Sequence, residues 1–146
     1  MFIVEEEFSE GTRQLRFSNA CRPDHHDVLG CDIVAHRLGH ALAAQAGARF
    51  GLDSKLHGET AKAQIGGQTV WLLKPATFMN LSGRSVAAAL RYWKIEPEEC
   101  LLAHDELDLE PGTARLKFDG GHGGQNGLRD TVQHLGHGRF HRLRIG

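Results

Sequence analysis

Two adjacent glycines, Gly66 and Gly67, stand between two runs that have the spacing of β-strands. Alternating apolar residues fill 61–65 before them, and a continuous apolar run fills 70–73 after them. A Gly-Gly loop of two residues matches the tight turn of an antiparallel hairpin, whose central residues need a positive φ. Any fold for this chain must therefore include an antiparallel β-hairpin near its middle.

Helical spacing of apolar residues occurs in three other segments, and short strand-like runs separate them. The expected helices are 31–46 with Gly47 as the left-handed stop, a segment that ends at Lys94 with Asn80 or Ser82 as N-cap, and 126–135. The expected further strands are 100–103, 114–118 and 140–145, and Pro75 ends the second hairpin strand. This order predicts a single α/β domain over 1–146 with a central sheet of mixed direction.

The two ends of the chain are the least regular parts of the sequence. In 1–29, the run Glu5–Glu7 is typical of a solvated acidic segment, 15–17 hints at a short strand, and 23–27 has the composition of a loop. At the other end, Ile145 and Gly146 close the chain in the middle of an expected strand. We therefore expect a divergent amino-terminal segment and a truncated carboxyl-terminal end.

Composition excludes several classes of protein. The chain has no apolar run of 18 residues, and its first ten residues are acidic and lack an apolar core, which argues against a membrane span and a signal peptide. Cys21, Cys31 and Cys100 are odd in number and widely spaced. Because this spacing fits neither a disulfide framework nor a zinc ribbon, we expect reduced thiols and a soluble, cytoplasmic domain without a cofactor.

Charge is distributed unevenly along the chain. Residues 1–111 carry 11 Lys/Arg and 16 Asp/Glu, whereas 112–146 carry 6 Lys/Arg, 2 Asp/Glu and four of the ten histidines. A basic carboxyl-terminal segment can attract a polyanion such as nucleic acid, although an ordinary solvated face has a similar composition.

Polar residues follow three of the expected strands, where ligands bind in open α/β sheets. Asn80 offers a donor and an acceptor near a helix start, or serves as an ordinary N-cap. Asp105, directly after a buried strand, can orient an imidazole and stabilise its charged form, or belongs to a solvated acidic turn. The sequence alone leaves both alternatives open.

The loop Gly120–Gly124 contains four glycines, more than one turn requires. Close approach of a ligand to the backbone would explain them, yet the loop matches no nucleotide-phosphate motif. Asn126, at the start of the next helix, can bind a carbonyl or anionic oxygen or cap the helix.

A metal site is disfavoured by the spacing of the ten histidines. His36 and His40 lack the glutamate of the H-E-x-x-H motif, and 134–141 contains helix-ending glycines between its three histidines.

Four segments together resemble the bacterial peptidyl-tRNA hydrolase family: K-P-A-T-F-M-N-L-S-G (74–83), H-D-E-L-D (104–108), G-G-H-G-G-Q-N-G-L-R-D (120–130) and F-H-R-L-R-I-G (140–146). The resemblance runs from about Gly30 to Gly146. It implies a three-layer α/β fold and a monomeric, metal-free enzyme that cleaves the ester between a peptide and the 3′ ribose of tRNA. Gln125 stands where many members of the family have histidine.

The resemblance also implies a role for individual residues. Asp105 would hold the general-base histidine in its correct tautomer, and Asn80 and Asn126 would bind the peptide backbone and the ester oxygen. The remaining positions that the resemblance implies are Phe78 and Met79 in the substrate groove and Lys117 and Arg144 on the tRNA backbone.

The base is the position where this sequence departs from the family pattern. Members open with a strand, a G-N-P-G loop and T-R-H-N-x-G, whose histidine is the base. No G-N-P-G occurs here, and only 26–34 can be aligned with H-N-x-G and the following helix. We take His26 as the base with His25 as the alternative, while Asn19 stands near the position of the family's loop asparagine.

Three hypotheses therefore follow from the sequence. The first is peptidyl-tRNA hydrolysis by water activated by His26 and Asp105. The second is a non-catalytic RNA-binding relative, which an altered base motif and an intact basic end would suit. The third is an inactive fragment, because the family continues past Gly146 into a further strand, a lid and a helix.

Overall fold

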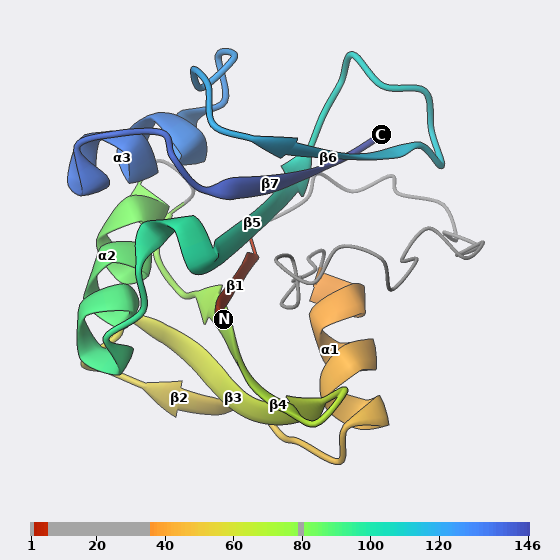
Figure 1. Cartoon of the computed structure of the whole chain (residues 1–146), viewed down its shortest axis with the longest axis vertical. Helices are drawn as coiled ribbons and strands as arrows, with labels where there is room; N and C mark the ends of the chain where they lie inside the picture. The colour runs from red at the N-terminus through yellow and green to blue at the C-terminus, as the bar shows by residue number, and fades with distance from the viewer. Residues whose placement is uncertain (1, 6–35, 79–80) are drawn as a thin grey trace.

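The structure, a computed structural model, describes residues 2–5, 36–78 and 81–146 (Figure 1). Within these ranges the chain forms one seven-stranded sheet in the order β2-β3-β4-β1-β5-β7-β6. The strands are β1 (Phe2–Glu5), β2 (Gly51–Asp53), β3 (Gly58–Ile65), β4 (Gln68–Pro75), β5 (Cys100–Asp105), β6 (Ala114–Phe118) and β7 (His141–Ile145). The helices are α1 (His36–Gln45), α2 (Ser82–Trp93), the 3₁₀ turn η2 (Pro97–Glu99) and α3 (Asn126–Leu135).

The centre of the sheet is parallel and both of its ends are antiparallel. β1 runs parallel to β4 and β5, and β5 runs parallel to β7. β3 pairs antiparallel with β2 and β4 at one end, and β6 pairs antiparallel with β7 at the other. The expected α/β fold with a mixed central sheet is confirmed.

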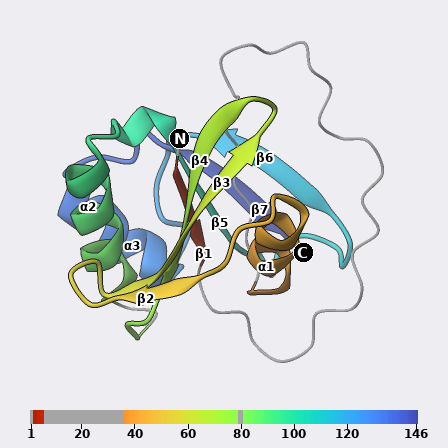
Figure 2. The ribbon, with the colours of Figure 1, turned by 90° about the horizontal axis from the view of Figure 1, so that it is seen from below.

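The helices cover the two faces of the sheet, so the domain has three layers (Figures 1 and 2). On one face, α2 and α3 contribute Val86, Leu90 and Leu128 to a core with Leu102 of β5. On the other face, Ala43 of α1 joins a second core, whose buried strand residues are Ala61, Ala63, Val70, Leu72 and Ala103. Alternate residues of each strand point to opposite faces, which is how β4 and β5 supply both cores.

The predicted hairpin is present as β3 and β4. Gly66 and Gly67 lie between the strands with φ of 58° and 80°, as the tight turn requires. Gly58 begins β3 so close to β4 that a Cβ at this position would overlap the backbone oxygen of Lys74. β4 ends at Pro75, as predicted.

The start of the second helix differs from the prediction, because α2 begins at Ser82 itself. Leu81, and neither Asn80 nor Ser82, is the N-cap of α2, and no side chain caps this end. The expectation of a polar cap is therefore wrong for Ser82, while the Asn80 side chain lies outside the described residues. The helix ends at Lys94 in the left-handed conformation, as predicted. Near its start, Gly83 lets α2 approach α3 until a Cβ would overlap the backbone of Asp130 and Thr131.

The strands differ from the prediction in three places. Glu5 is the last residue of β1, a strand that the sequence did not predict, and β1 lies in the centre of the sheet. β5 extends through His104 to Asp105, and the His104 side chain is 2% exposed. The short strand β2 was not predicted. The strand expected at 15–17 and the loop expected at 23–27 lie outside the described residues, and the described part of the first helix begins at His36.

The helices of the described residues were compared with the length and apolar character of a membrane span. None of those in the described ranges combines the length and the apolar character that crossing a bilayer requires.

Candidate active site and nucleic-acid interface

The carboxyl ends of the four parallel strands lie along one edge of the sheet, where α/β proteins bind their ligands. Asp105 is the last residue of β5 and stands opposite Ile145 of β7 in the parallel register. Phe78 follows the end of β4 and is 81% exposed. The structure therefore places two of the sequence-predicted residues, Asp105 and Phe78, at strand ends on this edge.

Other predicted residues of the site fall outside the described part of the chain. These are His26, His25 and Asn19 in the amino-terminal segment and Met79 and Asn80 before α2. Their assignments stay predictions.

Asn126 is the first residue of α3 and is exposed. It does not cap the helix, because Gln125 is the N-cap and its side chain accepts a hydrogen bond from the Leu128 amide at 2.6 Å. The alternative explanation of Asn126 as a capping residue is therefore wrong. Its side-chain amide is available for a role outside the helix.

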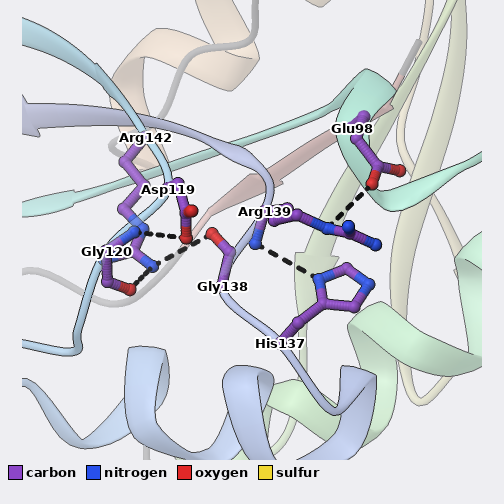
Figure 3. A network of polar contacts seen from close by, with 7 residues as sticks. All are labelled: Glu98, Asp119, Gly120, His137, Gly138, Arg139 and Arg142. Carbon is purple, nitrogen blue, oxygen red and sulfur yellow. Dashed lines mark hydrogen bonds and ion pairs between the residues drawn. The ribbon is translucent and has the colours of Figure 1, made fainter.

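The glycine loop in front of α3 is held by a buried arginine (Figure 3). Arg142 of β7 is 2% exposed. Its Nη1 donates to the carbonyl oxygen of Gly121 at 2.5 Å, and its Nη2 donates to those of Gly120 at 2.6 Å and Gly138 at 3.3 Å. The guanidinium also lies 4.7 Å from the centre of the Phe140 ring. Burial lowers the pKa of Arg142, and the nearby carboxylate of Asp119 partly opposes this shift.

A second arginine of β7, Arg144, is paired with an acidic residue at the edge of the sheet. Its Nε and Nη2 lie 2.9 and 2.8 Å from Oε2 of Glu106, which directly follows β5. Burial raises the pKa of Glu106, but the hydrogen bond and the charge of Arg144 outweigh it and hold this pKa below its ordinary value. Glu106 is therefore a carboxylate at neutral pH, and it fixes the position of the Arg144 side chain.

Four cationic residues share one face of β6 and β7. Arg115 and Lys117 of β6 stand directly opposite Arg144 and Arg142 in the antiparallel register, and residues in such positions share a face. Lys117 and Arg115 are exposed, whereas Arg142 is buried. We call Arg115, Lys117 and Arg144 the cationic face of the strand pair.

A comparison with known protein families assigns the chain. The family model described as peptidyl-tRNA hydrolase matches residues 32–146. The chain belongs to the peptidyl-tRNA hydrolase family. The matched range contains the carboxyl ends of β4, β5 and β7, but it begins after β1 and after His26.

Individual peptidyl-tRNA hydrolases agree with this assignment. The chain is 78% identical over 110 residues to the one from Xanthomonas campestris pv. campestris, covering 75% of this chain and 57% of that protein. It is 80% identical over 106 residues to the one from Stenotrophomonas maltophilia, covering 73% and 55%. The crystal structure of the Acinetobacter baumannii peptidyl-tRNA hydrolase superposes with a TM-score of 0.70 at 49% identity, covering 74% and 56%. The chain thus spans about half the length of the relatives it matches.

Arg142 and Glu106 are the residues of this peptidyl-tRNA hydrolase domain whose roles the sequence did not reveal. The alternation of Arg142 and Arg144 around Leu143 predicts that both arginines face the same way. It gives no sign that one is buried against backbone carbonyls while the other is paired with a carboxylate 38 positions earlier. Both partners are contributed by loops that only the folded chain brings to β7.

Three histidines near the carboxyl-terminal end of the chain have separate structural contacts. Nδ1 of His134 lies 3.3 Å from Oδ1 of Asp130, Nδ1 of His137 accepts from the Arg139 amide, and the His141 ring lies 4.8 Å from that of Phe118. Burial lowers the pKa of His141. Within the described ranges, no group of three or more His, Cys, Asp or Glu side chains is placed to hold a metal ion.

Proposed function

We propose that this protein hydrolyses the ester bond between the peptide and the 3′ ribose of peptidyl-tRNA. The observation that carries the proposal is the match of the peptidyl-tRNA hydrolase family over 32–146. This range includes Phe78 and Asp105 at the carboxyl ends of β4 and β5. The proposal places the reaction in the cytoplasm and assigns it to a monomer, in keeping with the reduced thiols that the sequence predicts and with a substrate made during translation.

In the proposed mechanism, His26 removes a proton from a water molecule as the water oxygen attacks the ester carbonyl. Asp105 accepts a hydrogen bond from the imidazole, which fixes its tautomer and stabilises its protonated form. The protonated His26 then returns the proton to the departing ribose oxygen, so that free tRNA and a peptide carboxylic acid result, and the acid then releases its proton to water. The position of Asp105 at the carboxyl end of β5 supports its part in this scheme.

Amide groups assist the reaction in the same scheme. Asn80 and Asn126 donate hydrogen bonds to the peptide backbone and to the oxygen that becomes negatively charged in the tetrahedral intermediate. Phe78 and Met79 line the groove for the peptide. The exposure of the Phe78 and Asn126 side chains supports these assignments.

The tRNA is held through its phosphates in this proposal. Lys117 and Arg144 contact the backbone and position the substrate without reading its sequence. The cationic face described above supports this role, because Arg115 and Lys117 extend it over the exposed strand β6.

Hydrolysis of a blocked aminoacyl-tRNA by the purified 146-residue chain tests the proposal. We expect cleavage by the wild type and a loss of about 10²-fold or more in Asp105→Ala and His26→Ala, the range that proton-transfer groups contribute. Asp108→Ala, in the exposed turn after β5, is the matched control and should keep full activity. Circular dichroism of each variant verifies folding. Full activity in folded Asp105→Ala would refute the mechanism.

A second candidate function is RNA binding without catalysis. It is favoured by a specific observation: the cationic face lies within the family match, whereas the proposed base His26 precedes it. A folded wild type that binds tRNA and does not cleave it would establish this alternative. A broad or absent thermal transition would instead indicate an inactive fragment.

A further inference from the structure

The glycine loop and Arg142 form a unit that the mechanism above does not use. The loop connects β6 to α3, and Asn126 is the first residue of α3. The Arg142 guanidinium reaches three carbonyl oxygens in two segments, Gly120 and Gly121 before α3 and Gly138 after it. One side chain therefore joins the two connections that hold α3 on the sheet.

The buried position of Arg142 excludes it from the set of phosphate contacts. Its exposed fraction is 2%, and the aromatic ring of Phe140 covers its guanidinium. Its charge is directed at backbone carbonyls, with Asp119 nearby. By contrast, Lys117, directly opposite on β6, is exposed to solvent. The two cations stand opposite each other on one strand pair, yet Arg142 is bound to backbone carbonyls and Lys117 is exposed.

The loop adopts a conformation that serves these contacts. Gly120 has φ of 113°, which side-chain-bearing residues rarely adopt. Asp119 stabilises the same turn, because its Oδ1 accepts from the Gly120 amide at 2.6 Å and its amide donates to the Phe140 carbonyl. At Gly138, a Cβ would come within 2.5 Å of the Gly120 oxygen and 2.9 Å of Arg142 Nη2. Glycine at this position leaves room for the network (Figure 3).

A second, local set of hydrogen bonds lies between this network and the start of α3. The Gly124 amide donates to Nδ1 of His122 and the Gln125 amide donates to the His122 carbonyl, so the second half of the loop is also fixed. Gln125 then caps the helix through the Leu128 amide. Asn126 follows directly, so the segment that Arg142 holds at Gly120 and Gly121 leads through this capped turn to Asn126.

We propose that Arg142 is a positioning residue that, by fixing the glycine loop, orients Asn126 toward the substrate. This inference rests on the proposed function for the substrate that Asn126 meets. The planar fork of arginine supplies two separate nitrogens to neighbouring carbonyls, which the single ammonium of lysine cannot reproduce. Arg142→Lys should therefore keep the charge and the fold but loosen the loop.

Amide hydrogen exchange in the isotope-labelled 146-residue chain is the first test. In Arg142→Lys we expect exchange in the loop 120–125 to rise about 10-fold or more, with a shift of the Asn126 side-chain amide signal. Arg139→Gln is the matched control, because Arg139 lies in the same network region but its exposed side chain pairs with Glu98 on the surface. Unchanged loop exchange in folded Arg142→Lys overturns the proposal.

Gly138→Ala approaches the same contact from the other segment, in case Arg142→Lys does not fold. The added methyl group should displace the Gly120 carbonyl and loosen the loop in the same way. If both the loop exchange and the Asn126 signal of this variant match those of the wild type, the proposal is overturned.

Kinetics separate positioning from general damage and from phosphate binding. Positioning predicts a kcat reduced about 10-fold or more in Arg142→Lys, with tRNA affinity and its salt dependence unchanged. Combined with Asn126→Ala, Arg142→Lys should have little further effect, because both act through one group. A fully additive double variant overturns the proposal. A wild type without hydrolysis, together with a loosened loop in Arg142→Lys, refutes the proposed function alone.

Discussion

The two ends of the sheet are both antiparallel, yet they differ in what covers them. At the β3–β4 end, Ala61 and Ala63 are buried on the side of α1, and exposed residues alternate with them. At the β6–β7 end, all five residues of β6 are exposed, including Leu116 and Phe118. The same pairing geometry thus supports a packed hairpin at one end and an open strand at the other.

The cations at the two ends also differ in how far they are packed against other residues. Lys74 is buried, forms an ion pair with Glu59 and donates to Nε2 of His40 at 2.9 Å, and Lys62 lies over the Trp71 ring. In the described part of the chain, Arg115 and Lys117 have no ion-pair partner. Positive charge at the hairpin end contributes to packing, whereas the cations of β6, Arg115 and Lys117, are exposed to solvent.

Among these predictions, the loss of a core side chain should have the largest effect on the free energy of unfolding. Leu72→Ala in β4 should lower the free energy of unfolding by about 2–5 kcal/mol, because Leu72 is 1% exposed and its removal leaves a cavity. Leu116→Ala in β6 is the matched substitution and should change it by less than about 0.5 kcal/mol. Urea unfolding of both variants measures the difference. Equal losses would show that β6 is covered in solution.

A methyl group added to a glycine should have the next largest effect. Gly58→Ala should cost about 2 kcal/mol of unfolding free energy, because the new Cβ overlaps the backbone of Lys74. Gly121→Ala should be nearly neutral, since no atom of another residue beyond its neighbours lies within 4 Å of the added Cβ. Thermal unfolding of the two variants provides the measurement. A cost at Gly121 as large as that at Gly58 would contradict the view that the hairpin end is the more tightly packed.

A smaller effect is expected at Glu106, and it depends on pH. The pKa of Glu106 is lowered in the folded chain, so its ion pair with Arg144 stabilises the fold above the unfolded pKa and is lost as pH falls through the folded one. Glu106→Gln should cost about 1 kcal/mol at neutral pH, because the pair is partly exposed. Urea unfolding at a series of pH values should show the two proteins converging in acid. A constant difference down to about pH 3 would mean that the carboxylate charge is not the cause.

The smallest expected effect concerns tRNA binding and leaves stability unchanged. Lys117→Ala should lower the affinity several-fold and reduce the slope of log affinity against log salt by about 0.9 or less, as the loss of one phosphate contact does. Lys62→Ala on β3 removes an equal charge at the other end of the sheet and should leave this slope unchanged. Filter binding across a salt series measures both. Equal slopes in the two variants would place the tRNA elsewhere.

Local signals in the sequence were sufficient for much of the fold. Gly66 and Gly67 specify the hairpin through their backbone conformation, and Leu128, Val132 and Leu135 specify α3 through their spacing. The hairpin and α3 are predicted correctly because these signals act within a few residues of one another. Family motifs then added Asp105 and Asn126, which are the last residue of β5 and the first residue of α3, and their roles stay predictions.

Other features depend on contacts between distant segments, which a local pattern does not contain. β1 has only three apolar residues before Glu5, and its pairing with β4 and β5 determines that it is a strand. β2 has three residues, too few for a period to show. The burial of Arg142 depends on carbonyls that lie 21 and 22 positions earlier.

The central place of β1 affects how the protein folds during its synthesis. Phe2 pairs with Trp71 and with Cys100, so β1 must wait for segments that follow it by up to about 100 residues. At ribosomal rates of about 5–20 residues per second, that delay is about 5–20 s. During this interval the β3–β4 hairpin and α2 can form and β1 can pair with β4, but the other edge of β1 lacks β5. The nascent chain therefore exposes an unpaired strand edge, a site where chaperones or aggregation act.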